Sequence, residues 1–167
     1  MRRVVAAVGL LLAAAGCGST RASPAISTLA TATHTRAGVS VRVSLVALGS
    51  AGWQLKVLFT PLSPGFHLYS LSLPDGGEQG LGIPTRLSVR GALNATGVVT
   101  AAEPTQQLDI AVLGVKLPVY PDGPVTLDLP VRHADGTAAQ VVVSYGACSA
   151  ATCLAPVIDE AIPVSVP

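Results

Sequence analysis

Apolar and polar residues alternate with a period of two over most of the chain after Gly38. In "VSVRVSLVAL", which begins at Val39, the first seven residues alternate between Val or Leu and Ser or Arg. A strand points successive side chains to opposite faces, so such a stretch predicts a strand with one buried face. The predicted strands are "GVSVRVSLVAL", "GWQLKVLFTP", "FHLYSLSL", "TRLSVRGAL", "TQQLDIAVLGV", "GPVTLDLPVR", "AAQVVVSYG" and "VIDEAIPVSV".

Turn-forming residues separate these eight stretches at short intervals. The chain has 17 glycines and 13 prolines, and turns such as "PDGG", "YPDGP" and "HADGT" interrupt the alternation before any helical repeat can develop. The pattern therefore predicts an all-β fold, an antiparallel β-sandwich of about eight strands. Pro130 and Pro163 must then lie at edges or bulges, because proline cannot donate a ladder hydrogen bond.

The first 16 residues follow a different pattern, with two arginines and then an unbroken run of apolar and small residues. The run is too short to span a bilayer as a helix, but it fits the basic and apolar regions of a secretory signal. The small residues "AAG" directly before Cys17 resemble a bacterial lipobox, in which the cut falls before a cysteine that carries a diacylglyceryl group. We expect residues 1–16 to be a lipoprotein signal peptide and Cys17 to be lipidated; the alternative is an ordinary signal with an incidental cysteine.

Composition divides the rest of the chain into two parts. Residues 17–37 are rich in Ser, Thr and Ala, which predicts a flexible tether, and residues 38–167 are long enough for one domain with a single core. Ten Lys and Arg stand against nine Asp and Glu without a basic run, which argues against nucleic acid and against electrostatic membrane binding. We therefore expect an extracytoplasmic domain, in the periplasm or cell envelope, held to a membrane by its lipid alone.

Cys148 and Cys153 are separated by "SAAT" and lie in a chain expected to reach an oxidising space. An extended segment would hold their Cα atoms roughly 17 Å apart, whereas a disulfide needs about 5.5 Å, so the chain must turn back between them. Cross-linking so short a loop stabilises little. The spacing leaves open a structural clip, a thiol-disulfide exchange site and a two-thiolate copper(I) site. Zinc would need a second pair of ligands, and we expect neither a resident metal nor a cofactor.

Three polar aromatic residues are candidates for the same site. His67 and Tyr69 alternate with apolar neighbours and should share a sheet face, and Tyr145 follows another strand just before Cys148. Motifs of hydrolases and phosphate-binding loops are missing from the sequence. The acidic residues are scattered near turns and predicted to be solvated: Asp75, Glu78, Glu103, Asp109, Asp122, Asp128, Asp135, Asp159 and Glu160.

Four segments in the same order resemble the N-terminal periplasmic domain of the thiol:disulfide interchange protein DsbD and of the related copper-sensitivity suppressor proteins. They are "WQLKVLFTPLSPGFHLYS", "GLGIPTRLSV", "LPVYPDGPVTLDLPV" and "VVVSYGACSAATCLAP", and the resemblance covers about Val39 to Val166. It implies an immunoglobulin-like sandwich with a reversible disulfide at one end. Electrons would pass between a membrane-embedded or thioredoxin-like donor and exported redox partners.

By position, the resemblance implies that Cys153 forms mixed disulfides with partners and that Cys148 resolves them, with Tyr69 and His67 beside the pair. The 167 residues depart from full-length members of the family in lacking a transmembrane conduit and a thioredoxin-like domain. Where many members have an aromatic cap loop, this chain has "IAVLGVK", which contains no aromatic ring.

The leading hypothesis is therefore a lipid-anchored thiol-disulfide exchange domain, a component of a protein-disulfide reductase system. The alternatives are a binding or structural lipoprotein with a static disulfide, and a copper(I)-binding or copper-tolerance protein.

Overall fold

The computed structural model describes residues 26–167, which fold into an all-β domain, as the alternation predicts. Each of the eight predicted stretches contains a strand, and this part of the chain has no α-helix, only the short 3-10 helix η1. No helix here has the length and apolar character needed to cross a membrane. The elements are β1 Ile26–Arg36, β2 Val39–Leu48, η1 Gly49–Ala51, β3 Trp53–Pro61, β4 His67–Leu68, β5 Arg86–Gly91, β6 Leu93–Ala95, β7 Thr100–Ala101, β8 Gln106–Ile110, β9 Val115–Val119, β10 Val125–His133, β11 Ala138–Tyr145, β12 Ala147–Cys148 and β13 Val157–Ser165.

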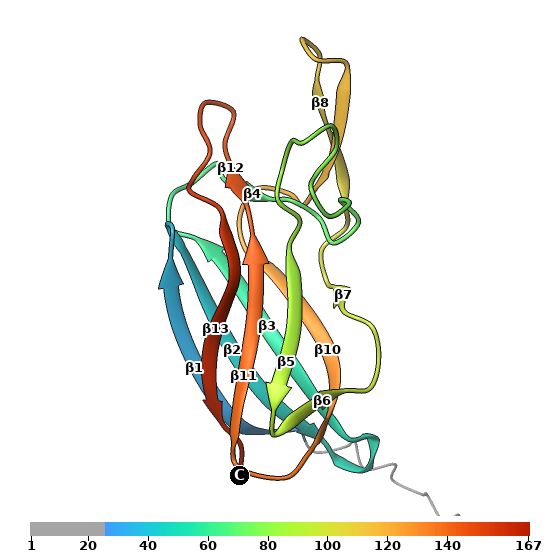
Figure 1. Cartoon of the computed structure of the whole chain (residues 1–167), viewed down its shortest axis with the longest axis vertical. Helices are drawn as coiled ribbons and strands as arrows, with labels where there is room; N and C mark the ends of the chain where they lie inside the picture. Colours follow the sequence, from blue (N-terminus) through green and yellow to red (C-terminus); the bar gives the residue numbers. More distant parts are fainter. Residues whose placement is uncertain (1–25) are drawn as a thin grey trace, which may run out of the picture.

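Two antiparallel sheets make up the body of the domain (Figure 1). The larger has the strand order β1-β2-β3-β10-β6, with β7 also paired to β10, and the smaller has the order β13-β11-β5. Two short ladders, β12 with β4 and β8 with β9, lie together at one end, the top of Figure 1. The C-terminus lies at the opposite end.

The core lies between the two sheets and is built from every second residue of their strands. Val41, Phe59 and Leu127 come from β2, β3 and β10, and they pack in one cluster with Val141 of β11 and Ile162 of β13. All five side chains are buried. The period-two pattern thus produces the core directly, because each strand gives its apolar face to the other sheet.

The boundary predicted between tether and domain is wrong. Residues 26–36, predicted to belong to the flexible tether, form the edge strand β1 and pair with β2 from Ile26↔Leu48 to Arg36↔Val39. The threonines of β1 face solvent, whereas Ala30 and Ala32 are half-buried against the core. The ordered domain therefore includes residue 26 and all that follows, and the predicted signal peptide and Cys17 lie outside the described residues.

Of the two internal prolines, only Pro163 lies at a sheet edge as predicted, in β13 of the smaller sheet. Pro130 lies instead in the interior strand β10, opposite Gln54 of β3. It falls between the part of β10 that pairs with β6 and the part that pairs with β7, and its carbonyl accepts a hydrogen bond from Thr96 N at 2.9 Å.

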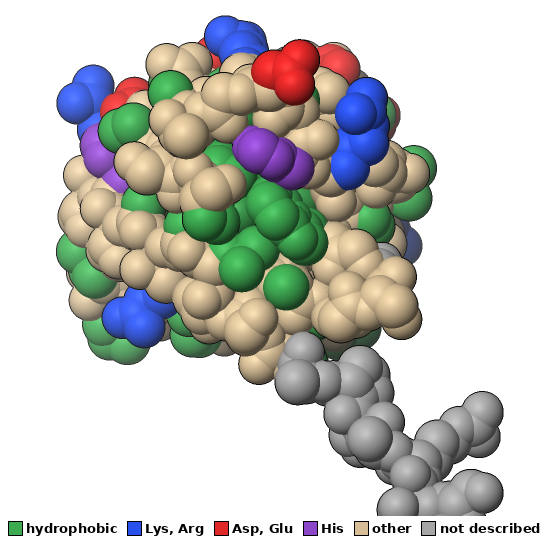
Figure 2. Space-filling model, turned by 90° about the horizontal axis from the view of Figure 1, so that it is seen from below, with side chains coloured by type: hydrophobic (Ala, Val, Ile, Leu, Met, Phe, Trp, Pro, Cys, Tyr) green, Lys and Arg blue, Asp and Glu red, His purple; other side chains and the backbone are tan. Residues whose placement is uncertain are grey.

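The end of the sandwich opposite the short ladders carries a gathering of hydrophobic side chains, with charged side chains around the rim (Figure 2). Trp53, the first residue of β3, stacks on His133, the last residue of β10, with ring centroids 5.4 Å apart. This pairing ties neighbouring strands of the larger sheet together far from the two cysteines.

Candidate functional site

Cys148 and Cys153 form a disulfide across a tight hairpin. Ser149 N donates to Thr152 O at 2.7 Å on one side of the pair, and Leu154 N donates to Ala147 O at 2.9 Å on the other. The cysteines are therefore the non-hydrogen-bonded pair of a small antiparallel ladder, the arrangement that brings side chains closest, and their Cα atoms are 4.0 Å apart. The turn required by the sequence spacing is present.

The two sulfur-bearing residues have unequal access to solvent. Cys148 is 6% exposed and packs in a small apolar cluster with Tyr69 and side chains of β9. Cys153 lies on the returning arm of the hairpin and is exposed. A bulky molecule approaching from solvent therefore meets Cys153 first.

Tyr69 directly contacts the buried sulfur. Its hydroxyl lies 3.2 Å from Cys148 Sγ, and a phenol O–H at this distance can donate to sulfur. Burial raises the pKa of Tyr69, so the hydroxyl keeps its proton throughout the neutral range. Thr85 Oγ1 donates to Tyr69 O at 2.6 Å, which fixes the backbone at this position. The structure thus places Tyr69 where the sequence predicts it.

His67 lies across the β4–β12 ladder from Cys148, and only 6% of its surface is exposed. Its Nδ1 lies 3.3 Å from Asp122 Oδ1, whereas its buried Nε2 has no hydrogen-bond partner. The ring meets Tyr69 edge to face at 6.1 Å, which confirms that these two residues share a face. Asp122 is exposed, as predicted for a solvated surface acid, and what the prediction missed is its contact with His67. Its place in "YPDGP", one of the four resembling segments, was the available signal for that contact.

Tyr145 is not at the disulfide. Its ring packs edge to face against Phe59 in the main core, with centroids 5.5 Å apart, and its hydroxyl donates to Arg36 O at 3.0 Å. The chain crosses from the smaller sheet to the β4–β12 ladder between Tyr145 and Cys148, so the two side chains belong to different clusters. Tyr145 instead ties β11 to the end of β1.

Raising the pH is expected to destabilise the domain through Tyr145. Burial, and then the nearby Glu160 carboxylate, raise the pKa of Tyr145 to about 12, against an opposing effect of Arg36. The unfolded chain ionises tyrosine near pH 10, so between pH 10 and 12 deprotonation favours the unfolded state and stability falls as pH rises. The expected loss by pH 11 is about 1.4 kcal/mol.

Urea unfolding at pH 8 and at pH 11 measures this loss, and the Tyr145→Phe variant is the comparison. The variant loses stability at pH 8 because Arg36 O loses its donor, but its further loss at pH 11 should be smaller than that of the unaltered protein. Tyr69 is present in both proteins, so its contribution to the alkaline loss of stability cancels in the comparison. An equal alkaline loss in the two proteins would show that Tyr145 does not carry the effect.

Two hollows flank the cysteine hairpin. The larger, about 820 Å³, lies between the hairpin turn and β8, and its lining includes His67 and Asp122. The smaller, about 160 Å³, is bordered by both cysteines, together with Tyr69 and Ile83. The disulfide therefore lies between two recesses of different size.

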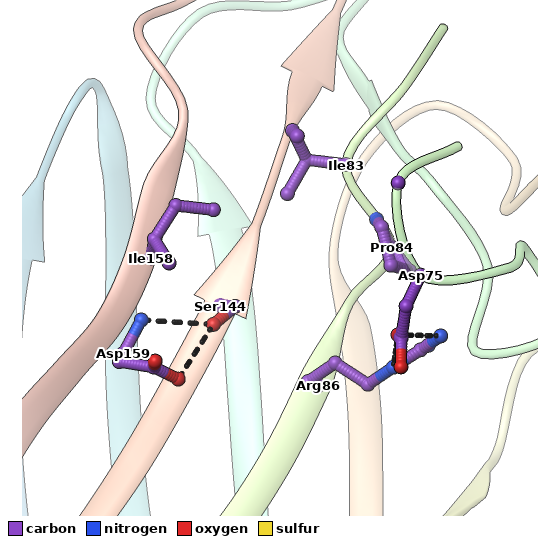
Figure 3. Close-up of a pocket in the computed structure, with 8 residues that line it drawn as sticks. Asp75, Ile83, Pro84, Arg86, Ser144, Ile158 and Asp159 are labelled. Atoms are coloured by element: carbon purple, nitrogen blue, oxygen red, sulfur yellow. Dashed lines mark hydrogen bonds and ion pairs between the residues drawn. The ribbon is translucent and has the colours of Figure 1, made fainter. Parts of the chain in front are cut away.

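A third pocket of about 340 Å³ lies beside β5 and β11, and neither cysteine lines it (Figure 3). Arg86 in its lining points at Asp75 and donates to Oδ1 from Nε and Nη2 at 2.9 and 2.7 Å. Arg86 Nη2 also donates to Leu73 O at 2.7 Å. These bonds hold the loop before β5 against the sheet, which gives Arg86 a structural role.

The fold and the site define the class of this protein: an antiparallel β-sandwich domain with a half-buried disulfide at one end. Residues 26–167 contain no group of three or more His, Cys, Asp and Glu side chains arranged to hold a metal ion. No protein-family model, curated protein or solved structure matches the chain.

Proposed function

We propose that this domain carries out thiol-disulfide exchange through a reversible Cys148–Cys153 bond. The observation that carries the proposal is the asymmetry of the pair, with Cys153 exposed and Cys148 buried beneath a tyrosine hydroxyl 3.2 Å from its sulfur. The bond closes a loop with a sequence separation of 5, so it adds little to stability in a domain that already has a continuous core.

Reduction of the domain starts when a donor thiolate attacks Cys153 Sγ. A donor–Cys153 disulfide forms, the Cys148–Cys153 bond breaks, and the electron pair of that bond stays on Cys148 as a thiolate. The Tyr69 hydroxyl donates to the departing sulfur and stabilises its charge. A second donor thiolate then displaces Cys153, so that two electrons have entered the pair and the donor leaves as a disulfide.

Transfer to a partner follows the same path in reverse. The Cys153 thiolate attacks the partner's disulfide and releases one partner thiolate, and Cys148 then attacks Cys153 Sγ and releases the other. Cys148 must be deprotonated for this second step. We assign the proton exchange to His67, which lies across the ladder from Cys148 and is oriented by Asp122.

The same proposal includes the cellular setting. The lipobox-like residues before Cys17 support a lipid anchor and an extracytoplasmic location. The resemblance to the N-terminal domain of DsbD supports exported thiol-disulfide proteins as partners and a membrane conduit or thioredoxin-like protein as donor. It also supports an immunoglobulin-like strand topology.

Equilibrium titration of the disulfide against a thiol redox buffer tests the proposal. An exchange site is expected to have a midpoint above about −300 mV, within reach of thioredoxin-like donors. The fraction of reduced protein is measured by thiol alkylation and mass. A midpoint well below about −300 mV, with no reduction by a thioredoxin-like donor, would instead establish a static clip.

A further inference from the structure

The smaller hollow beside the disulfide has a lining without charged groups. Besides the two cysteines it is formed by Tyr69, Ile83, Leu154 and Pro156, together with the small residues Gly82, Gly146 and Ala147. We refer to it as the apolar hollow. Because neither a carboxylate nor a cationic side chain lines it, entry of a charged group would cost desolvation without a compensating partner.

Two glycines allow the walls of the apolar hollow to pack closely. A Cβ atom on Gly82 would lie 2.8 Å from Tyr69 Cε1, and one on Gly146 would lie 3.1 Å from Ile83 Cβ. The ring of Tyr69 therefore packs directly on glycine backbone at both positions. The same tyrosine that contacts the buried sulfur thus forms a wall of the hollow.

We propose that the apolar hollow is a specificity subsite that receives an uncharged apolar side chain next to the partner's reactive cysteine. This inference rests on the proposed exchange at Cys153. In the mixed disulfide the partner's cysteine Cα lies about 5.5 Å from that of Cys153, and the next partner residue is about 3.8 Å further along the chain. Both cysteines border the hollow. The side chain next to the partner's cysteine is therefore brought to the opening of the hollow.

The size and chemistry of the hollow agree with one aliphatic side chain. Its volume of about 160 Å³ is close to that of a dry cavity of roughly 150 Å³ that accepts a benzene molecule. The larger hollow, on the hairpin's other side, has Asp122 and His67 in its lining and offers a polar environment. The two recesses thus select for different residues, and the apolar one lies beside both sulfurs.

The rate of reaction with short disulfide peptides tests the subsite. Capped tripeptides Leu-Cys-Leu, Gly-Cys-Gly, Glu-Cys-Glu and Lys-Cys-Lys are each prepared as a mixed disulfide with a nitrothiobenzoate. The reduced full-length protein carries Cys17→Ser, so that only the cysteine pair reacts. Cys153 attacks the peptide sulfur, a Cys153–peptide bond forms, and the aryl thiolate that leaves is followed by its absorbance. Leu-Cys-Leu is expected to react about tenfold faster than Gly-Cys-Gly, and both charged peptides no faster than Gly-Cys-Gly.

The Ile83→Ala variant removes part of the wall and should reduce the preference for Leu-Cys-Leu to less than threefold. Ile158→Ala is the matched control, because Ile158 shares the third pocket with Ile83 but does not line the apolar hollow. It should keep the full preference. Reaction with hydroxyethyl disulfide, which has no neighbouring side chain, should be the same in all three proteins.

The possible outcomes separate the subsite from the exchange reaction itself. Equal rates with all four peptides, or a preference that survives Ile83→Ala unchanged, would overturn the subsite while leaving exchange intact. A failure to react with hydroxyethyl disulfide as well as with every peptide would overturn the proposed function. Faster reaction of a charged peptide than of Leu-Cys-Leu would also overturn the subsite.

Discussion

Replacing Cys153 by serine is expected to abolish thiol-disulfide exchange, whereas replacing Cys148 should leave a protein that forms mixed disulfides but does not resolve them. In the proposed exchange a partner reaches the sulfur of Cys153, because Cys153 is exposed whereas Cys148 is 6% exposed beneath Tyr69. With an aromatic disulfide as probe, the reduced Cys153→Ser variant should react at least about 100-fold more slowly than Cys148→Ser. Stopped-flow absorbance gives the two rates.

Each variant also carries Cys17→Ser, so that the third cysteine does not react with the probe. Mass spectrometry should find a stable adduct on Cys153 in the Cys148→Ser protein. When both cysteines are present, it should find the Cys148–Cys153 disulfide and no adduct. If the two single-cysteine proteins reacted at equal rates, the unequal access of the two sulfurs would not govern exchange. A stable adduct on Cys148 alone would reverse the assigned roles.

Substituting Gly82 by alanine is expected to lower both stability and exchange. Gly82 has a φ of +82°, which disfavours any L side chain, and its new Cβ would lie 2.8 Å from the Tyr69 ring and 2.9 Å from Leu73 Cδ2. The combined cost is about 3 kcal/mol, from left-handed backbone and overpacking together. Because the ring must shift to relieve the clash, its hydroxyl should also leave Cys148 Sγ.

Gly80→Ala is the control for the backbone contribution. Gly80 has nearly the same φ, +80°, but a Cβ there would meet no atom within 4 Å. Its expected cost is about 1 kcal/mol, with an unchanged rate of exchange. Urea unfolding measures the stabilities of the two variants. The rate of reaction with hydroxyethyl disulfide measures the effect of each substitution on exchange. Equal losses in the two variants would mean that Tyr69 accommodates the extra methyl group without moving.

Period-two alternation was sufficient to predict the body of the fold but not its first strand. The stretch "ISTLATATHTR" contains two large aliphatic residues, Ile26 and Leu29, and its composition is that of a linker. It forms a strand because its backbone pairs with β2 from Ile26 to Arg36, with one register shift at Leu29, and composition alone does not reveal such pairing. The alternation of Thr31, Thr33 and Thr35 with smaller or half-buried neighbours was a usable signal, since threonine favours strands.

The candidate site was predicted where spacing and register determine contacts, and missed where the chain changes sheets. The disulfide and the shared face of His67 and Tyr69 follow from local sequence. Tyr145 was misplaced because the crossing to β12 turns the chain away from the main core within three residues. Asp122 was missed because it meets His67 across 55 residues of sequence, a distance that no local pattern spans.

The hairpin that carries the cysteines has a consequence for the lifetime of any covalent intermediate. The backbone hydrogen bonds from Ser149 N to Thr152 O and from Leu154 N to Ala147 O involve neither sulfur, so in the proposed exchange they would keep the two sulfurs opposite each other after reduction. This would give Cys148 a high effective concentration toward Cys153. A captured partner would then be released before its own cysteines could rearrange. Such an arrangement suits delivery of electron pairs, and it is poorly suited to disulfide isomerisation, which requires a long-lived adduct.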